Sequence, residues 1–177
     1  MRALIYYVAA SLDGFIAEPD GRFHRFPAGD HVAAFLETLP RFGAVLMGRA
    51  TYAVGLEHGV TSPYPMLAEQ YVYSSTMTAS PDPAVQLVGH DAVEHIAGLK
   101  NASGDDIWLC GGARLAGSLW RAGLIDQVWV KQNPLVLGAG IPLFGGEGLE
   151  PAALRLTDLR RFESGVVELR YAVDRAA

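Results

Sequence analysis

The sequence predicts an α/β fold with a central mixed, mostly parallel sheet, helices on both faces and an antiparallel C-terminal edge. Two observations lead to this prediction. As far as Asp126, short apolar runs alternate with segments of helical periodicity. From Gln127 onward that periodicity disappears and long strand-like runs follow, the last two joined by a hairpin at residues 163–165. Parallel strands therefore come first and antiparallel strands last.

Composition fits one compact domain, residues 1–177. Half of the 177 residues are hydrophobic and 19% are charged, enough for a full-sized core, and neither a repeat nor a linker is visible. A net charge of −5 without a basic stripe excludes a nucleic-acid phosphate track. The apolar run at residues 2–10 is too short for a membrane span and no signal-peptide cleavage pattern follows, so we expect a cytoplasmic protein.

Cysteine and histidine usage argues against a metal centre. The single cysteine, Cys110, allows neither an internal disulfide nor a cysteine-based zinc cluster, and we expect it to pack as a small apolar residue. No two of the five histidines have metal-ligand spacing, so we predict no metal.

The apolar runs predict buried strands, and the periodic segments between them predict helices. Strands are expected at residues 2–10, 43–47, 71–74 and 107–110, with a shorter one within 80–88. Asp30 precedes a helix whose apolar face is predicted to hold Val32, Phe35, Leu36 and Leu39. Further helices are expected at 91–100 and between Gly112 and Gly123, with a short one beginning at residues 49–51.

Glycines and small polar residues follow several of these strands. Gly111 and Gly112 end one strand before a helix, where backbone N–H groups can approach an anion, although such a pair is also common in a plain tight turn. The segments SLDGFIA (residues 11–17), MGRATY (47–52) and YSST (73–76) also stand at strand ends. Ligands of open α/β sheets bind at such ends, so we expect one cleft there.

Taken together, these segments resemble the dihydrofolate-reductase-like fold, and specifically the C-terminal reductase domain of the riboflavin-biosynthesis deaminase-reductase family. SLDGFIA, LMGRATY, CGGARLAGSLWRAGLIDQVWV and PLVLGAGIPLF carry the resemblance, which spans nearly the whole chain. It implies a three-layer αβα fold, hydride transfer from NADPH and a small heterocyclic substrate. The chain departs from the family pattern in two places, because it lacks a Lys before SLDG and an Arg-Ala-rich segment before the second strand. No deaminase motif is present either.

The resemblance assigns cofactor contacts to the strand-end segments. Arg49, with Ser74 and Ser75, would hold the extra phosphate of NADPH through charge-assisted hydrogen bonds, although each could equally be an ordinary surface residue. Thr51 would cap a helix or reach a phosphate. The residues expected to contact the cofactor are Ala10, Ile16, Gly48, Arg49, Thr51, Ser74, Ser75, Gly111, Gly112, Ala113, Arg114 and Leu115.

Substrate contacts are expected from Ser11, Asp13 and Phe26, where Asp13 could instead only end the strand with a turn. Asp30 is either the acid that supports protonation of a C=N bond or an N-cap. The stretch GAGIPLFGG is not a Rossmann fingerprint, because the third glycine is missing and Pro142 interrupts the helix start. We expect its glycines to lie close to a dimer partner or to the substrate pocket.

The leading functional hypothesis is therefore an NADPH-dependent reductase of a pyrimidine-like or pteridine-like molecule, with 5-amino-6-(5-phosphoribosylamino)uracil reductase as the nearest named activity. Dihydrofolate reductase is the first alternative, and a non-catalytic NADPH-binding or scaffold protein is the alternative of another class. A homodimer is expected, supported by the exposed-looking strand at Val128, Trp129 and Val130.

Overall fold

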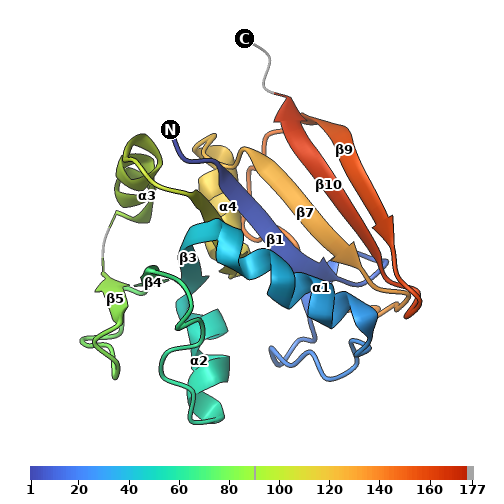
Figure 1. Ribbon diagram of the computed structural model, residues 1–177, viewed down its shortest axis with the longest axis horizontal. Coiled ribbons are helices and arrows are strands. Elements are labelled where there is room, and N and C mark those ends of the chain that lie inside the picture. Colours follow the sequence, from blue (N-terminus) through green and yellow to red (C-terminus); the bar gives the residue numbers. More distant parts are fainter. Residues whose placement is uncertain (90, 175–177) are drawn as a thin grey trace.

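The computed structural model describes residues 1–89 and 91–174, and within them eight strands form one twisted sheet (Figure 1). The strand order is β5-β4-β3-β6-β1-β7-β10-β9. Their bounds are β1 Leu4–Ala10, β3 Phe42–Gly48, β4 Glu69–Tyr73, β5 Val85–Val88, β6 Asp106–Gly111, β7 Gln127–Gln132, β9 Ala153–Arg161 and β10 Val167–Asp174. Neighbours from β5 to β7 are parallel, while β10 pairs antiparallel with β7 and β9. The predicted mixed sheet with an antiparallel C-terminal edge is confirmed.

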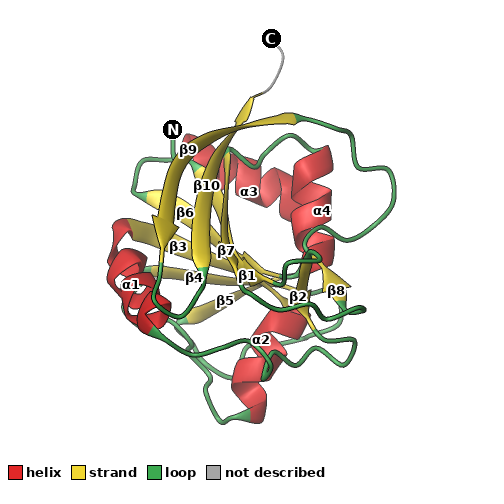
Figure 2. Ribbon diagram, turned by 90° about the vertical axis from the view of Figure 1, so that its right-hand side faces the viewer, coloured by secondary structure: helices red, strands yellow, loops and turns green. Residues whose placement is uncertain are grey.

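Helices cover both faces of this sheet (Figure 2). On one face lie α1 (Asp30–Thr38), continued by a 3₁₀ turn (Leu39–Arg41), and α2 (Arg49–Glu57). On the other lie α3 (Ala92–Asn101) and α4 (Ala113–Arg121). A small antiparallel pair, β2 (Phe15–Ala17) and β8 (Ile141–Pro142), stands beside the main sheet. The layers are helix, sheet and helix, as predicted.

Each central strand contributes to two hydrophobic cores, because successive side chains point to opposite faces. Tyr6 packs into the core beneath α3 and α4, whereas Tyr7 packs into the core beneath α1 and α2. Leu109 and Trp108 of β6 divide in the same way. This two-sided burial explains why these strands are continuous apolar runs in the sequence. Among the described residues, no helix is long and apolar enough to span a bilayer.

The predicted apolar face of α1 is only partly correct. Phe35 packs against the core, but Val32 and Leu36 are 41% and 54% exposed, and the helix buries His31 and Ala34 instead. The prediction of Asp30 as N-cap is also wrong, because Gly29 occupies that position. Helical periodicity defines a face, but the position of the sheet beneath it decides which face is buried.

One further expectation is corrected by the packing. The strand with Val128 and Trp129 lies inside the sheet between β1 and β10, and both side chains are buried, so it is not an exposed dimer edge. Two glycines of GAGIPLFGG make close contacts within the chain, and the expected position of this stretch near a dimer partner or the substrate pocket stays a prediction. Gly145 lies against Gly117 of α4, and Gly140 lies against the carbonyl of Ala17 in β2.

Gly117→Ala should therefore destabilise the protein, although alanine normally favours a helix. A Cβ at residue 117 would stand 1.8 Å from the backbone oxygen of Gly145, which cannot rotate away. We expect the free energy of unfolding in urea to fall by about 1–3 kcal/mol. Gly98→Ala in α3 is the matched control, since nothing lies within 4 Å of its Cβ position. It should gain up to about 1 kcal/mol. Equal effects at the two positions would contradict the packing described.

Candidate functional site

The centre of the candidate site lies between β3 and β6, where the chain leaves two neighbouring strands in opposite directions. β3 continues into α2 on one face and towards β4, whereas β6 continues into α4 on the other face and towards β7. Such a switch point opens a crevice at the carboxyl ends of parallel strands, where ligands of open α/β sheets bind. Met47 and Gly111 are paired across the two strand ends.

Two glycines let the helix N-termini meet at this crevice. A Cβ on Gly112 would lie 3.2 Å from the Cα of Gly48 and 3.4 Å from its nitrogen. Gly112 also has a φ of +103°, which L side chains rarely adopt. Both residues are helix N-caps, neither helix has a side-chain cap, and neither has an acidic residue in its first turn. The amides and dipoles of two helices are thus directed at one place, which suits an anion.

Two arginines stand beside the meeting helices. Arg49 is the first residue of α2 and Arg114 the second of α4, and both are exposed. Neither forms an ion pair with any residue that the structure describes. Their guanidinium groups are available for phosphate oxygens, which they bind in bidentate geometry.

The remaining predicted cofactor residues occupy neighbouring strand ends. Thr51 faces Gly111, since a Cβ there would meet its hydroxyl at 3.2 Å. After β4, Ser74 is buried and Ser75 exposed, and the Ser74 hydroxyl accepts the N–H groups of Thr76 and Met77 at 3.2 and 3.0 Å. Because β4, β3, β6 and β1 are successive in the sheet, these groups and the residues after β1 share one edge.

In the loop after β1, the side chains of two predicted substrate residues form hydrogen bonds within and between loops. The Ser11 hydroxyl donates to Asp13 at 2.6 Å, and Asp13 accepts the N–H groups of Leu137 and Gly138 at 3.1 and 2.7 Å. The Ser11 hydrogen bond first, and then those from Gly138 and Leu137, hold the pKa of Asp13 below its usual value. This carboxylate therefore joins the loop after β1 to the loop after β7.

Backbone groups of β1 are joined to the same region. The Ala10 carbonyl accepts both the backbone and the side-chain N–H of Asn133, at 2.8 and 3.2 Å. Ile16 lies in β2, which pairs with β8. Phe26 is partly buried in the loop before α1. Asn133 carried no sequence signal, since a single Asn before a proline is ordinary loop chemistry.

In the described part of the chain, Asp30 does not contact the residues at this edge. Its carboxylate binds the turn between β9 and β10 instead. It accepts the N–H groups of Glu163 and Ser164 at 2.9 and 3.2 Å. The bond from Glu163 is the main cause that lowers the pKa of Asp30. Asp30 thus has a structural role in holding this turn, and its role as a proton donor stays a prediction.

A polar cluster beneath α1 was not anticipated from the sequence. Lys131 of β7 pairs in register with Glu168 of β10, and both are buried. The Tyr7 hydroxyl donates to Glu168, which also accepts Arg170 Nε at 2.7 Å. Burial lowers the pKa of Lys131 to about 8. Burial first, and then the charge of Lys131, lowers the pKa of His31 on α1. The only sequence signal was one lysine inside an otherwise apolar strand.

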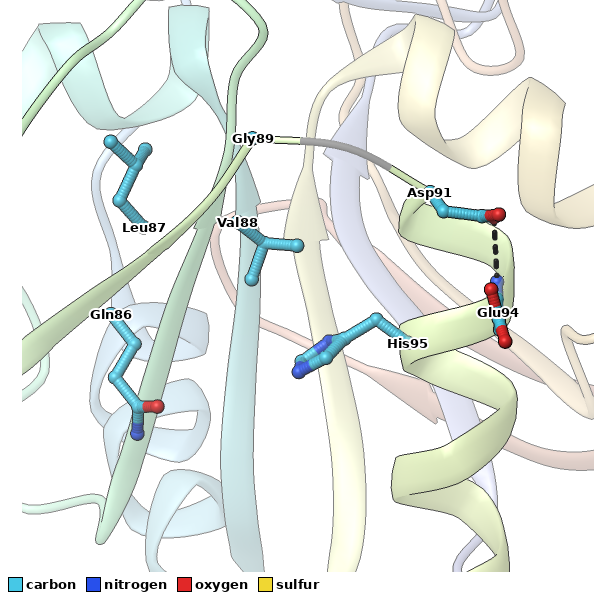
Figure 3. A pocket seen from close by; sticks show the side chains of 7 residues that line it. All are labelled: Gln86, Leu87, Val88, Gly89, Asp91, Glu94 and His95. Carbon is cyan, nitrogen blue, oxygen red and sulfur yellow. Dashed lines mark hydrogen bonds between the residues drawn. The ribbon is translucent and has the colours of Figure 1, made fainter.

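A hollow of about 500 Å³ lies at the outer end of the sheet (Figure 3). The His95 side chain points from α3 towards β5, and its Nδ1 lies 3.0 Å from the Tyr73 hydroxyl. Ser74 adjoins this region through its N–H, which donates to the Val88 carbonyl at 3.1 Å. The described lining is Gln86, Leu87, Val88, Gly89, Asp91, Glu94 and His95. The hollow thus lies next to Ser74, on the side of β5 and α3. The sequence did not indicate it.

Comparison with known proteins defines the family and the fold class of this chain. A family model, the RibD C-terminal domain, matches residues 2–168. The uncharacterized protein YwjB of Bacillus subtilis is 31% identical over 175 residues, which cover 96% of this chain and 97% of that protein. The structure of a putative riboflavin biosynthesis protein from Shewanella sp. PV-4 is similar with a TM-score of 0.82 and 29% identity, covering 98% and 99% of the two chains.

The fold is also that of dihydrofolate reductase. The enzyme from Enterococcus faecalis, solved in complex with NADP(H) and RAB-propyl, superposes with a TM-score of 0.68 at 16% identity, covering 98% of this chain and 97% of that one. The class is thus the dihydrofolate-reductase-like α/β fold. Within it, the chain belongs to the RibD C-terminal domain family.

The contacts of Asp30 make a stability prediction. Because the folded pKa lies below the unfolded value, Asp30 should stabilise the fold at neutral pH, and this contribution should disappear as the pH falls through the folded pKa. Asp30→Asn should therefore lower the urea midpoint at pH 7 and lower it less at an acidic pH, where the carboxylate becomes protonated. Glu37→Gln, exposed on the same helix, is the control. A loss of the same size at both pH values would show that the carboxylate charge does not matter.

Proposed function

We propose that the protein is an NADPH-dependent reductase of a small planar heterocycle. The carrying observation is the contact of Gly48 with Gly112, which brings two uncapped helix N-termini and the exposed Arg49 and Arg114 to one crevice. Membership of the RibD C-terminal domain family supports a reductase. The nearest named activity is 5-amino-6-(5-phosphoribosylamino)uracil reductase of riboflavin biosynthesis.

The residues present fit a dinucleotide. Any Cβ at residue 112 would fill the space against Gly48, so the backbone stays open to a pyrophosphate at this point. Gly111, Ala113 and Leu115 complete the turn and first residues of α4, and Thr51 faces the turn from α2. When bound, NADPH supplies the hydride, and the protein's task is to orient it against an electrophilic carbon and to exclude water.

Selection of NADPH over NADH is proposed for the outer part of the edge. Arg49 supplies a charged fork, and Ser75 is exposed on the neighbouring strand end beside Ser74. The Ser74 hydroxyl accepts two backbone N–H groups and also lies 3.4 Å from the Thr76 hydroxyl, so Ser75, which is exposed, is the freer hydroxyl donor for a phosphate oxygen. Cation and donors thus come from adjacent strands, β3 and β4.

The substrate end is proposed near β1 and α1, around Ala10, Ser11, Asp13, Ile16 and Phe26. Asp13 shapes this end through its bonds to the loop after β7 rather than by contact with substrate. Dihydrofolate is the alternative substrate, supported by the shared fold alone. A non-catalytic nucleotide-binding protein is the alternative of another class, and it predicts NADPH binding without NADPH oxidation by any pyrimidine or pteridine tested.

A homodimer remains part of the proposal, through a different surface from the one expected. All nine residues of β9 are exposed, and Leu154, Leu156 and Leu159 are 42–49% exposed along this edge strand. In Figure 1 β9 is the outermost strand at one edge of the sheet. A long exposed edge with apolar side chains is suited to pairing with a second copy.

Arg49→Ala should weaken NADPH binding by about 1.5–3 kcal/mol, the value of a lost charge-assisted hydrogen bond. NADH lacks the extra phosphate, so its affinity should change much less. Isothermal titration of both cofactors measures the difference, and Arg22→Ala, in the exposed loop before α1, is the control for loss of a positive charge. Equal losses for the two cofactors would refute the phosphate role of Arg49.

A further inference from the structure

Lys131 is a buried cation next to the proposed substrate end. It stands one position before the end of β7, in register with Ala9 of β1, and only 9% of it is exposed. Two residues later, Asn133 bonds to the Ala10 carbonyl. Lys131 therefore lies at the carboxyl edge of the sheet, on the face that α1 covers with Phe35.

The ammonium group of Lys131 contacts aromatic rings rather than oxygen atoms. Its Nζ lies 3.5 Å from the centroid of the Phe35 ring and 5.0 Å from that of Tyr7. An ammonium has three N–H donors, and within residues 1–89 and 91–174 none of them has a hydrogen-bond acceptor. Cation–π contacts offset part of the cost of burying the charge, but they supply no acceptor.

The neighbouring carboxylate does not fill this role. Glu168 faces Lys131 across the strands, yet its two oxygens receive the Tyr7 hydroxyl and the guanidinium of Arg170. No ion pair within 4.0 Å forms between Lys131 and Glu168 among the described pairs. Its negative charge helps to keep the lysine protonated, while burial acts against protonation and dominates.

The other lysine of the chain shows the usual arrangement. Lys100 is also buried, and its Nζ donates both to the Leu124 carbonyl and to the carboxylate of Asp126. One buried lysine thus has its acceptors from the fold, whereas the one at the ligand edge has none. The described residues supply no acceptor for the Lys131 donors, so water or a ligand can accept from them.

We propose that Lys131 is a specificity-determining residue of the substrate pocket, whose ammonium receives an anionic oxygen of a planar heterocycle bound between α1 and the carboxyl ends of β1 and β7. The assignment rests on the proposed function for the position of the substrate. An anion is favoured over a neutral ligand because a buried ammonium gains most from an opposite charge in a medium of low dielectric constant. Phe35 offers an aromatic surface at the same place.

The test compares two pyrimidines of similar shape, barbiturate, which is an anion at neutral pH, and uracil, which is neutral. Their dissociation constants are measured by isothermal titration with and without NADPH for the wild type, Lys131→Met and Arg41→Met. Arg41 is an exposed cation over Trp129 in the same aromatic cluster, with its guanidinium carbon 5.3 Å from the ring centroid. The wild type and Arg41→Met should bind barbiturate at least tenfold more tightly than uracil, and Lys131→Met should bind both alike.

A pH series on the wild type needs no variant and keeps the proposal testable if Lys131→Met fails to fold. The charged or titratable groups that interact with Lys131 are Glu168 on β10, His31 on α1 and Cys110 on β6, while Arg170 on β10 binds Glu168. Burial lowers the pKa of His31 below its usual value and raises the pKa of Cys110 to about 11. The preference for barbiturate should therefore fall as the pH rises through about 8, where the Lys131 ammonium loses its proton.

Three outcomes would overturn the assignment. The wild type could show no preference for barbiturate, which includes no measurable binding of either pyrimidine. Lys131→Met could retain the preference, or the preference could stay constant across the pH series. The NADPH titrations separate this result from the proposed function. If the protein binds NADPH but does not prefer barbiturate, only the assignment of Lys131 is refuted. If it prefers barbiturate but does not bind NADPH, the reductase proposal is refuted and Lys131 remains an anion-binding residue.

Discussion

The close approach of Gly48 and Gly112 is the constraint on which the candidate site depends. Because these two glycines meet, α2 and α4 begin side by side although they leave for opposite faces of the sheet. A side chain at residue 112 would be tight against the Gly48 backbone and strained at a φ of +103°, so the helix starts would have to shift apart. The contact of Thr51 with Gly111 adds a second close approach between the same two strand ends. One backbone contact thus sets the geometry of dipoles, amides and cations together.

Aspartates arrange the rest of the edge by binding backbone N–H groups. Asp13 connects the loop after β1 to the loop after β7, and Asp30 closes the turn between β9 and β10. The pKa of Asp13 is lowered first by the Ser11 hydroxyl and then by these N–H groups, and the pKa of Asp30 is lowered mainly by the Glu163 N–H, so both carboxylates stay charged at neutral pH. Rigid loops of this kind keep a binding surface ready before a ligand arrives, which reduces the entropy lost on binding. Lys131 is the contrasting case, a charge that the fold surrounds with rings and leaves without an acceptor.

The order of strands and helices could be predicted because local sequence determines it. Continuous apolar runs mark β1, β3 and β6, glycines mark their ends, and the hairpin at residues 163–165 has its turn residues in place. Prediction was wrong where a neighbour distant in sequence decides the outcome. Trp129 is covered by β10 and by its contacts with Tyr7 and Phe42, none of which its own strand reveals. Likewise Asp30 caps a turn 133 residues away, and Lys131 became notable only once its partners were known.

The central claim is that the Gly48–Gly112 crevice holds the pyrophosphate of NADPH. Its most direct measurement is the dissociation constant of NADPH for Gly112→Ala, set against Gly59→Ala. Both glycines have positive φ values, +103° and +73°, so both substitutions strain the backbone, but only residue 112 lies against Gly48. The account predicts at least tenfold weaker NADPH binding for Gly112→Ala and unchanged binding for Gly59→Ala. NADPH affinity equal to wild type in Gly112→Ala, with the fold intact, would contradict it.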